Sequence, residues 1–350
     1  MTPRAAAVAI LLVAVIVGAM ATLLRLGGFD VALALSALWH GSVGSWYAFT
    51  SATLVRVIPL LLTGTAVAIA FRAGVLNIGG EGQLLIGAAG TAAVALAFPG
   101  GGWVTVLVAL LAGALAGAGW AGIAGILRVR FGVLEVISTI MLNFVALYLV
   151  SFLVRGPLQE PTHAYPQSRV IAQGVHLLRL PGAGRLHVGL LLAVAVALWS
   201  GWFLRHSAAG FRLVAVGESP TAAASAGLIG VGETMTKAFL ASGAIAGLAG
   251  ACEVLGVTFA LYEDISPGYG YTAIAIALLA RLDPWLVIPA ALLFAALEAG
   301  AGAMQRDAGV PASLVTVIEA ALILAAAVVP TLRRGRGHAA CRAGDPSPAA

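Results

Sequence analysis

The chain has 350 residues, of which 61% are hydrophobic and only 9% are charged. Because a soluble domain carries about 25% charged residues, this composition excludes a water-soluble globular protein, and the apolar content excludes a disordered or fibrous chain. The formal net charge of +5 comes from arginines scattered between apolar runs, a pattern typical of membrane topology rather than of nucleic-acid binding. We therefore expect an all-α integral membrane protein with no nucleic-acid partner.

About ten runs approach the roughly 20 apolar residues that a helix needs to cross a bilayer. The candidate spans are residues 5–24, 52–70, 83–98, 103–127, 133–154, 187–204, 238–257, 270–281, 284–300 and 312–331. The runs 83–98 and 270–281 are short, which is typical of broken or re-entrant helices buried in protein. The stretch 30–50 contains Trp39 and Trp46 and is predicted to lie at the membrane surface, where tryptophan is enriched.

Arginine and lysine distribution predicts the orientation of these spans. With both termini in the cytoplasm, the inner loops collect more basic residues than the outer loops, as the positive-inside rule requires. Residues 155–186 then form a proline-containing outer loop, and residues 205–236 form an inner hydrophilic segment. Within the inner segment, Ser219 and Pro220 predict the capped start of a short surface helix. The polar tail, residues 332–350, is predicted to be disordered.

The segment 71–83 places three polar side chains, Asn77, Glu81 and Gln83, among four glycines and between two apolar runs. Glycine allows close backbone approach, so this segment could be an interrupted helix that exposes amides and carbonyls to a solute. A plain cytoplasmic turn is the alternative.

A second group of polar residues lies within the predicted span 133–154. Glu135, Thr139 and Asn143 are four residues apart and share one helix face. Such a stripe must face protein or water, so it is either a set of interhelical hydrogen bonds or part of a solute pathway.

Small residues and one further carboxyl group mark the span 238–257. Gly243 and Gly247 form a GxxxG pair, and with Gly250 they predict close helix packing. Glu253 follows them and is a weaker candidate for the solute pathway.

Motifs for catalysis are missing from the sequence. It contains no hydrolytic triad pattern, no H-E-x-x-H helix, no phosphate-binding loop and no cysteine or histidine spacing typical of a metal site. We therefore expect neither an enzyme nor a bound cofactor. Without a nucleotide-binding motif the chain cannot drive active transport alone, so the energy for moving a solute must come from an ion gradient or from a partner.

Five motifs, in order along residues 50–331, resemble a known family. They are F-R-A-G-V-L-N-I-G-G-E-G-Q at 71–83, R-F-G-V-L-E-V-I-S-T-I-M-L-N-F at 130–144 with V-R-G-P-L at 154–158, G-F-R-L-V-A-V-G-E-S-P at 210–220 with A-G-L at 226–228, S-G-A-I-A-G-L-A-G-A-C-E-V-L-G at 242–256, and P-G-Y-G-Y-T-A-I-A-I-A-L-L-A-R at 267–281. They are similar to the permease subunits of bacterial ABC importers for nucleosides, which are related to the ribose and simple-sugar permeases. The G-G-E-G-Q form resembles the larger of the two permeases that pair in the nucleoside systems.

This resemblance implies a permease domain over residues 1–331 in the bacterial plasma membrane, working by alternating access. It implies that residues 210–228 form a cytoplasmic coupling loop that docks on a separate ATPase subunit, which uses the ATP. The implied coupling residues are Arg212, Gly217, Glu218, Ser219, Pro220, Ala223 and Gly227. The other implied partners are a second, homologous permease, an extracytoplasmic substrate-binding lipoprotein and membrane lipid.

The sequence departs from the family pattern at Leu134 and Ser219, where asparagine is common, and at Thr272, where an acidic residue is common. Leu134 adjoins the proposed pathway and bears on the cargo. A simple sugar such as ribose or galactose is the first alternative, and an ion-coupled secondary transporter is a remoter one. An aromatic side chain near the pathway, such as Phe144, Tyr148 or Phe259, would favour a nucleoside.

Overall fold

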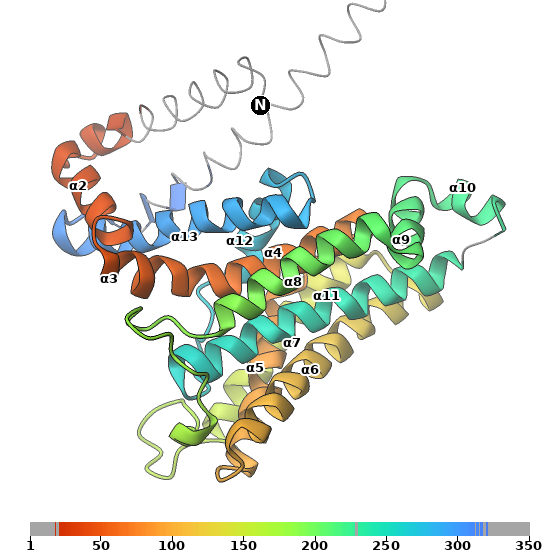
Figure 1. Ribbon diagram of the computed structural model, residues 1–350, viewed down its shortest axis with the longest axis horizontal. Helices are drawn as coiled ribbons and strands as arrows, with labels where there is room; N and C mark the ends of the chain where they lie inside the picture. Colours follow the sequence, from red (N-terminus) through yellow and green to blue (C-terminus); the bar gives the residue numbers. More distant parts are fainter. Residues whose placement is uncertain are drawn as a thin grey trace, which may run out of the picture. The chain divides into compact units, whose positions relative to one another are not determined.

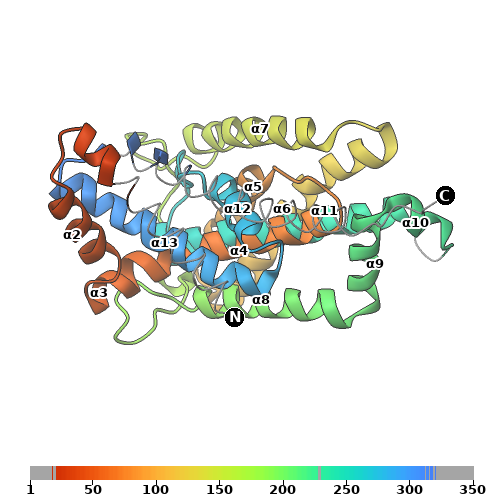
Figure 2. The same cartoon turned by 90° about the horizontal axis from the view of Figure 1, so that it is seen from above.

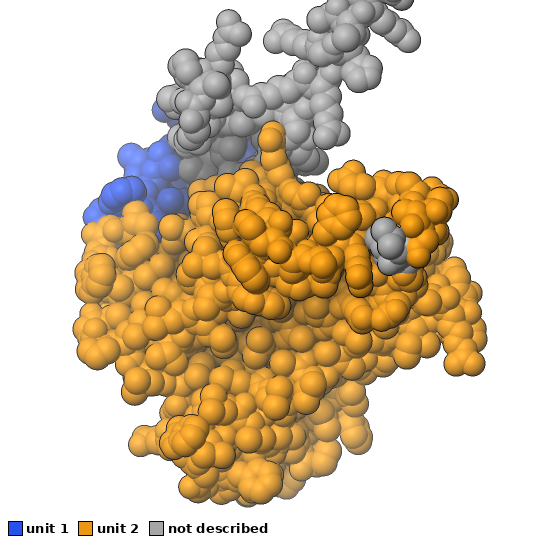
Figure 3. Space-filling view, turned by 45° about the vertical axis from the view of Figure 1, so that its right-hand side comes forward, with its two compact units in different colours: residues 1–42, 297–350 blue, residues 43–296 orange. Residues whose placement is uncertain are grey.

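The computed structural model describes residues 21–227 and 230–311, together with Gly18, Ser313, Leu314, Thr316, Val317 and Ala320. The chain divides into two compact units, residues 43–296 and residues 1–42 with 297–350, which are coloured separately in Figure 3. Within the described residues, extended pairing is limited to three isolated bridges, and the predicted all-α fold is confirmed.

The larger unit is a bundle of helices of very different lengths (Figure 1). In chain order they are α3 (Trp46–Ala48), the π-helical turn η1 (Phe49–Thr53), α4 (Leu54–Arg72), α5 (Gly80–Ala97), α6 (Gly102–Phe131), α7 (Glu135–Arg155), the 3-10 turn η2 (Gln173–Val175), α8 (Gly189–His206), α9 (Ala208–Glu218), α10 (Pro220–Ser225), α11 (Val231–Glu253), the π-helical turn η3 (Val254–Thr258), α12 (Tyr269–Leu279) and α13 (Pro284–Asp307), which continues into the smaller unit. Figure 2 shows α5 and α12 in the middle of this unit, with α4 beside them and α7 along one side.

Seven of the described helices are long and apolar enough to cross a membrane, counted by length and composition. They are Trp46–Arg72, Gly80–Ala97, Gly102–Phe131, Glu135–Arg155, Gly189–His206, Val231–Thr258 and Pro284–Asp307. The predicted short span 270–281 corresponds to α12, whose 11 residues extend only about 16 Å, too little to cross the bilayer. The predicted spans 5–24 and 312–331 lie mainly, and the tail 332–350 wholly, outside the described residues.

The first long helix of the described residues begins at Trp46 and not at residue 52, so the predicted span 52–70 starts six residues too late. Ser45 caps this helix by accepting a hydrogen bond from the amide of Ala48 at 3.0 Å. The Thr50 hydroxyl donates to the Trp46 carbonyl at 2.8 Å, so a polar side chain is satisfied within the helix itself. Only α2 (Val31–Ser42) forms a separate short helix in that stretch.

The inner segment 205–236 contains more helix than the single short element that the sequence predicts. Ser219 caps α10 by accepting from the Ala222 amide at 3.3 Å, with Pro220 in its first turn, as expected. Ser207 caps the additional helix α9 in the same way, through the Gly210 amide at 2.9 Å. Figures 1 and 2 show α9 lying across the end of α8.

Glycines let α5, α6 and α11 cross at backbone distance in the centre of the larger unit. A Cβ added at Gly243 or Gly247 of α11 would overlap the carbonyl oxygen of Gly117 or Gly113 of α6. Further along α11, a Cβ at Gly250 would overlap the carbonyl oxygen of Leu84 in α5. The GxxxG pair and Gly250 therefore lie in helix contacts, as the spacing predicts for small residues.

Residues 156–188 are irregular apart from the 3-10 turn η2. An ion pair fixes the neighbouring end of α7, because Arg155 Nη2 lies 2.6 Å from Glu263 Oε2 in the loop before α12. The Ser151 hydroxyl also donates to the Glu263 carboxylate at 2.6 Å. These hydrogen bonds, chiefly that of the Arg155 guanidinium, hold the pKa of Glu263 below its ordinary value.

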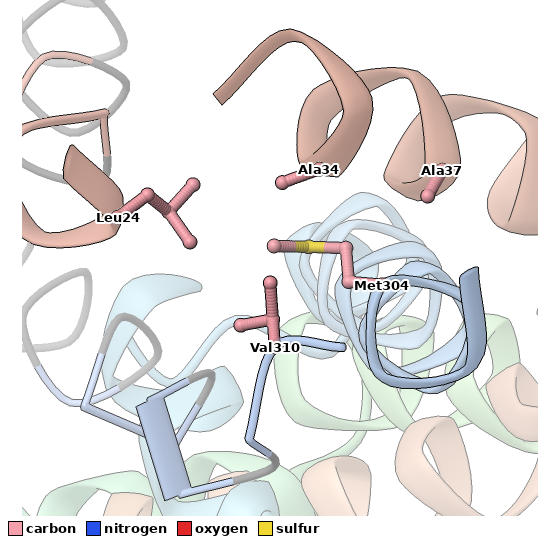
Figure 4. Packing of buried hydrophobic residues seen from close by; sticks show 5 residues of the cluster. All are labelled: Leu24, Ala34, Ala37, Met304 and Val310. Atoms are coloured by element: carbon pink, nitrogen blue, oxygen red, sulfur yellow. The ribbon is translucent and has the colours of Figure 1, made fainter. Parts of the chain in front are cut away.

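The smaller unit has its own apolar cluster, formed by Leu24, Ala34, Ala37, Met304 and Val310 (Figure 4). Asp30 starts α2 by accepting hydrogen bonds from two amides of its first turn, at 2.8 and 3.1 Å. The small residues of α2 allow α13 to approach closely, since a Cβ added at Gly41 would overlap Ala303.

The glycine crossing predicts a position-specific effect within one helix. Gly117→Ala would press a methyl group into the Gly243 carbonyl and lower stability by about 1–3 kcal/mol, as overpacking does. Gly119→Ala, two residues along α6, meets open space and should leave stability unchanged or slightly higher, because alanine is the better helix former. Thermal unfolding of both variants in one detergent measures the difference; equal melting temperatures would contradict this packing.

Candidate functional site

A non-helical stretch, residues 73–79, separates α4 from α5 in the larger unit. We call it the interrupted segment. α4 ends at Arg72, whose side chain donates to the carbonyl of Leu282 at 3.2 Å, and α5 begins at Gly80. Ala73, Val75 and Asn77 are buried in this extended stretch. Irregular backbone at membrane depth is tolerated only when its polar groups find partners within the protein. The segment is thus a largely buried break between α4 and α5, and its exposure to a solute stays a prediction.

Asn77 supplies partners for this backbone and joins three parts of the chain. It is fully buried, and its Oδ1 accepts from the Gly79 amide at 3.0 Å and from Gln83 Nε2 at 2.9 Å. Its Nδ2 donates to Gln83 Oε1 at 3.1 Å and to the Ser242 hydroxyl of α11 at 2.9 Å. Ser242 is about 17 Å along α11 from its first residue, which places this junction well inside the helix bundle.

Two residues of the α7 stripe form hydrogen bonds with Ile78 of the segment and with the first turn of α5. Asn143 Oδ1 accepts from the Gly82 amide at 2.8 Å, and its Nδ2 donates to the Ile78 carbonyl at 3.0 Å. The Thr139 hydroxyl accepts from the Ile78 amide at 3.3 Å. Glu135 does not share this role, because it forms an ion pair with Arg128 Nε at 3.0 Å across the α6–α7 turn.

Glu81 connects the starts of two helices. Its Oε2 accepts from the Gly270 amide at 2.7 Å, although the two residues are 189 positions apart in the chain. Gly270 lies so close that a Cβ there would overlap the Glu81 backbone. The N-terminal ends of α5 and α12 therefore meet at this carboxyl group, where both helix dipoles favour negative charge.

The polar side chains described above form what we call the polar centre: Asn77, Glu81, Gln83, Thr139 and Asn143. Tyr271 completes it, and the sequence analysis did not identify this residue. Its hydroxyl lies 3.4 Å from Asn143 Nδ2, while its ring remains 47% exposed. The only signal in the sequence was the G-Y-G-Y motif that contributed to the family resemblance. An exposed aromatic ring beside an amide is a suitable surface for a planar, hydrogen-bonding solute.

The other candidate residues lie apart from this centre. Phe144 and Tyr148 are exposed on α7, whereas Phe259 stacks on His176 at 4.0 Å between ring centroids. Glu253 is buried at the far end of α11, where Arg56 and Arg185 are the charged groups that act on it. Among residues 21–227 and 230–311 no group of three histidine, cysteine or acidic side chains could hold a metal ion.

The predicted coupling segment contacts the interrupted helix directly. Gly217, near the end of α9, lies so close to the chain that a Cβ would overlap the Arg72 carbonyl. Gly74, with φ of +72°, faces the same residue, because a Cβ there would be 3.0 Å from Gly217 Cα. Glycine at both positions thus allows two backbones to touch.

The remaining coupling candidates lie around that contact. Arg212 and Glu218 are exposed on α9, Ala223 is buried on α10, and Gly227 has φ of +68°. Of these residues, Arg212 and Glu218 are accessible from outside the chain.

Comparison with known proteins shows where this arrangement belongs. Residues 49–327 match the family model described as branched-chain amino acid transport system / permease component. The chain belongs to this permease family. It is therefore a multi-pass membrane protein and a transport subunit.

Individual relatives cover most of the chain. It is 38% identical to the guanosine ABC transporter permease NupP of Bacillus subtilis over 319 residues, which are 89% of this chain and 91% of the relative. It is also 38% identical to the glucose ABC transporter permease TsgB13 of Haloferax volcanii, over 85% of this chain and 80% of the relative. The nucleoside permease NupB of Lactococcus lactis is 32% identical, over 79% and 78%. No solved structure matches significantly.

The hydrogen-bond network predicts a ranking of stability losses. Asn77→Ala leaves the Gly79 amide, both ends of Gln83 and Ser242 without their present partner, at about 1–3 kcal/mol for each buried group left unpaired. Thr139→Val removes one long bond to the segment and should cost less. Thermal unfolding in detergent compares them, and a larger loss for Thr139→Val would contradict the network.

Proposed function

We propose that the chain forms one half of the translocation pathway of an ATP-driven importer whose cargo is a nucleoside. The observation that carries the proposal is the continuous contact from Gly217, through Arg72 and Gly74, to Asn77 and the polar centre. A cytoplasmic push on α9 would reach the interrupted segment through backbone contacts. Movement of that segment would change the hydrogen bonds of Asn77 and Asn143, and so alternate the exposure of a central site.

The chemistry of the centre supports a neutral, hydrogen-bonding cargo. Amide groups of Asn77, Gln83 and Asn143 can exchange hydrogen bonds with hydroxyl groups or with base edges, and Thr139 adds a hydroxyl. Tyr271 adds an exposed aromatic face, which suits stacking with a nucleobase. The guanosine and nucleoside permeases among the relatives point to the same class of cargo.

A simple sugar is the second candidate. The glucose permease of Haloferax volcanii is as similar to this chain, at 38%, as the guanosine permease is. Sugars also stack on aromatic rings and bind to amides, so the same centre could serve them.

The proposed assembly has several partners. An ATPase subunit would bind at Arg212, Gly217, Glu218, Ser219, Pro220, Ala223 and Gly227 and would hydrolyse the ATP. A second, homologous permease would complete the pathway, and a substrate-binding lipoprotein would deliver cargo to the outer loop, residues 155–186. This arrangement places the chain in the bacterial plasma membrane with both termini in the cytoplasm, and it retains Glu135 and Glu253 as pathway candidates nearer the two membrane surfaces.

Uptake by cells tests the cargo. Deleting this chain should abolish ATP-dependent uptake of labelled guanosine and leave labelled glucose unaffected. Tyr271→Ala should reduce guanosine uptake by about tenfold, which corresponds to roughly 1.4 kcal/mol of lost stacking, whereas Tyr271→Phe should retain most of it. Loss of glucose uptake in place of guanosine uptake would transfer the proposal to sugars.

The contact between α9 and the interrupted helix predicts a separation of ATP hydrolysis from transport. Gly217→Ala would push α9 away from Arg72, so uptake should fall about tenfold or more, in line with overpacking of 1–3 kcal/mol, while the ATPase subunits still hydrolyse ATP. Gly174→Ala, in the outer loop and without neighbours within 4 Å, is the matched control. Normal uptake by Gly217→Ala in the reconstituted importer would overturn this route.

A further inference from the structure

A slot of about 230 Å³ lies beside the coupling segment, between the ends of α8 and α11 that adjoin α9. Ile69 of α4 and Leu213 of α9 belong to its lining. The side walls are apolar and include Trp199, Phe203 and Ile245. The rings of Trp199 and Phe203 stack on each other with centroids 5.2 Å apart, which gives that wall a flat hydrocarbon surface.

Charge is confined to one end of the slot. Arg212, Glu233 and Lys237 line it there, and Lys237 pairs with Glu233 at 2.5 Å. Both members of that pair are 70% exposed, so a ligand could approach them from outside. Two cations face one carboxylate, and the net charge at this end is positive.

The order of these residues follows the depth profile of a lipid leaflet. Lys237 lies in the second turn of α11, whereas Ile245 is about 20 Å along that helix from Val231. Trp199 is about 10 Å along α8 from His206, which places it at a height between that of Lys237 and that of Ile245. Thr234 is the one uncharged polar side chain in the lining. An acyl chain with an anionic head matches both the apolar walls and the charged end.

We propose that this slot binds one anionic phospholipid, with an acyl chain between Trp199 and Ile245 and the phosphate between Arg212 and Lys237. The lipid lies against α9, whose far end touches Arg72 and Gly74 through Gly217. Binding of lipid in the slot would therefore set the position of α9, the helix that transmits movement from the ATPase subunit. Anionic lipid would then be required for coupling between ATP hydrolysis and transport. This last consequence rests on the proposed function, whereas the binding site itself does not.

Binding is measured on the purified full-length chain in mixed micelles, by quenching of tryptophan fluorescence with phospholipids that carry brominated acyl chains. The probes are brominated phosphatidylglycerol and brominated phosphatidylcholine, and the Trp199→Phe variant identifies the part of the signal that comes from Trp199. We expect phosphatidylglycerol to quench Trp199 at several-fold lower mole fraction than phosphatidylcholine. Equal quenching by the two lipids would overturn the proposal.

Two variants test the head and the tail separately. Lys237→Gln should weaken phosphatidylglycerol binding about fivefold and leave phosphatidylcholine unchanged, whereas Lys237→Arg should preserve the preference. Ala241→Phe fills the slot without altering charge and should remove the Trp199 signal for both lipids. Unchanged binding in Lys237→Gln, or unchanged Trp199 quenching in Ala241→Phe, would refute the site. No transport is measured, so failure here is distinguishable from failure of the proposed function.

Discussion

Seven residues of non-helical backbone, Ala73 to Gly79, cross the interior of a bundle that is otherwise helical. In an apolar environment each unpaired amide or carbonyl costs several kcal/mol. Backbone carbonyls accept from the amides of Ala73, Gly74, Val75 and Asn77, and side chains supply further hydrogen bonds at Ile78 and Gly79. Asn77 and Asn143 provide most of those hydrogen bonds, and Thr139 provides one more. These contacts join α7 and α11 to the segment and to the start of α5, because Asn143 bonds to Gly82 and Ile78, and Asn77 bonds to Ser242.

Close packing of α6 against α11 is a second feature of the structure, beside the hydrogen bonds of the interrupted segment. Gly117, Gly243 and Gly247 bring α6 and α11 to backbone contact. Ser242, the residue before Gly243 on α11, lies 2.9 Å from Asn77 of the segment. Glycines also allow backbone contact at Gly217 and Gly74, where α9 meets the start of the interrupted segment. Rigid contact of this kind transmits displacement better than flexible side chains, because packed backbones have little free space to absorb it.

Local signals in the sequence predicted the local features. The composition gave the all-helical fold, Ser219 and Pro220 predicted the start of α10, and the glycine-rich segment 71–83 predicted the interruption. The additional helix α9 could also have been found, because Ser207 precedes it as a capping residue. The span predicted from residue 52 begins earlier, at Trp46, and the hydroxyl of Thr50 bonds to the backbone of that helix.

Contacts between distant residues could not be predicted in this way. Tyr271 and Asn143 are 128 positions apart, and nothing in either local pattern indicates their pairing. The equal spacing of Glu135, Thr139 and Asn143 suggested one continuous stripe, but Arg128, on the preceding helix, binds Glu135 and separates it from the other two. Helix periodicity gives the face on which a residue lies, whereas its partner depends on how the helices are arranged.

The central claim is that the interrupted segment changes its exposure as the importer turns over. The most direct measurement is labelling of a single cysteine at Ile78, in a chain with Cys252→Ala and Cys341→Ser, by a membrane-impermeant thiol reagent applied to the reconstituted importer. We expect ATP binding to change the labelling rate several-fold, while a cysteine at the exposed position Gly119 reacts at the same rate in both states. Identical labelling of position 78 with and without ATP would contradict it.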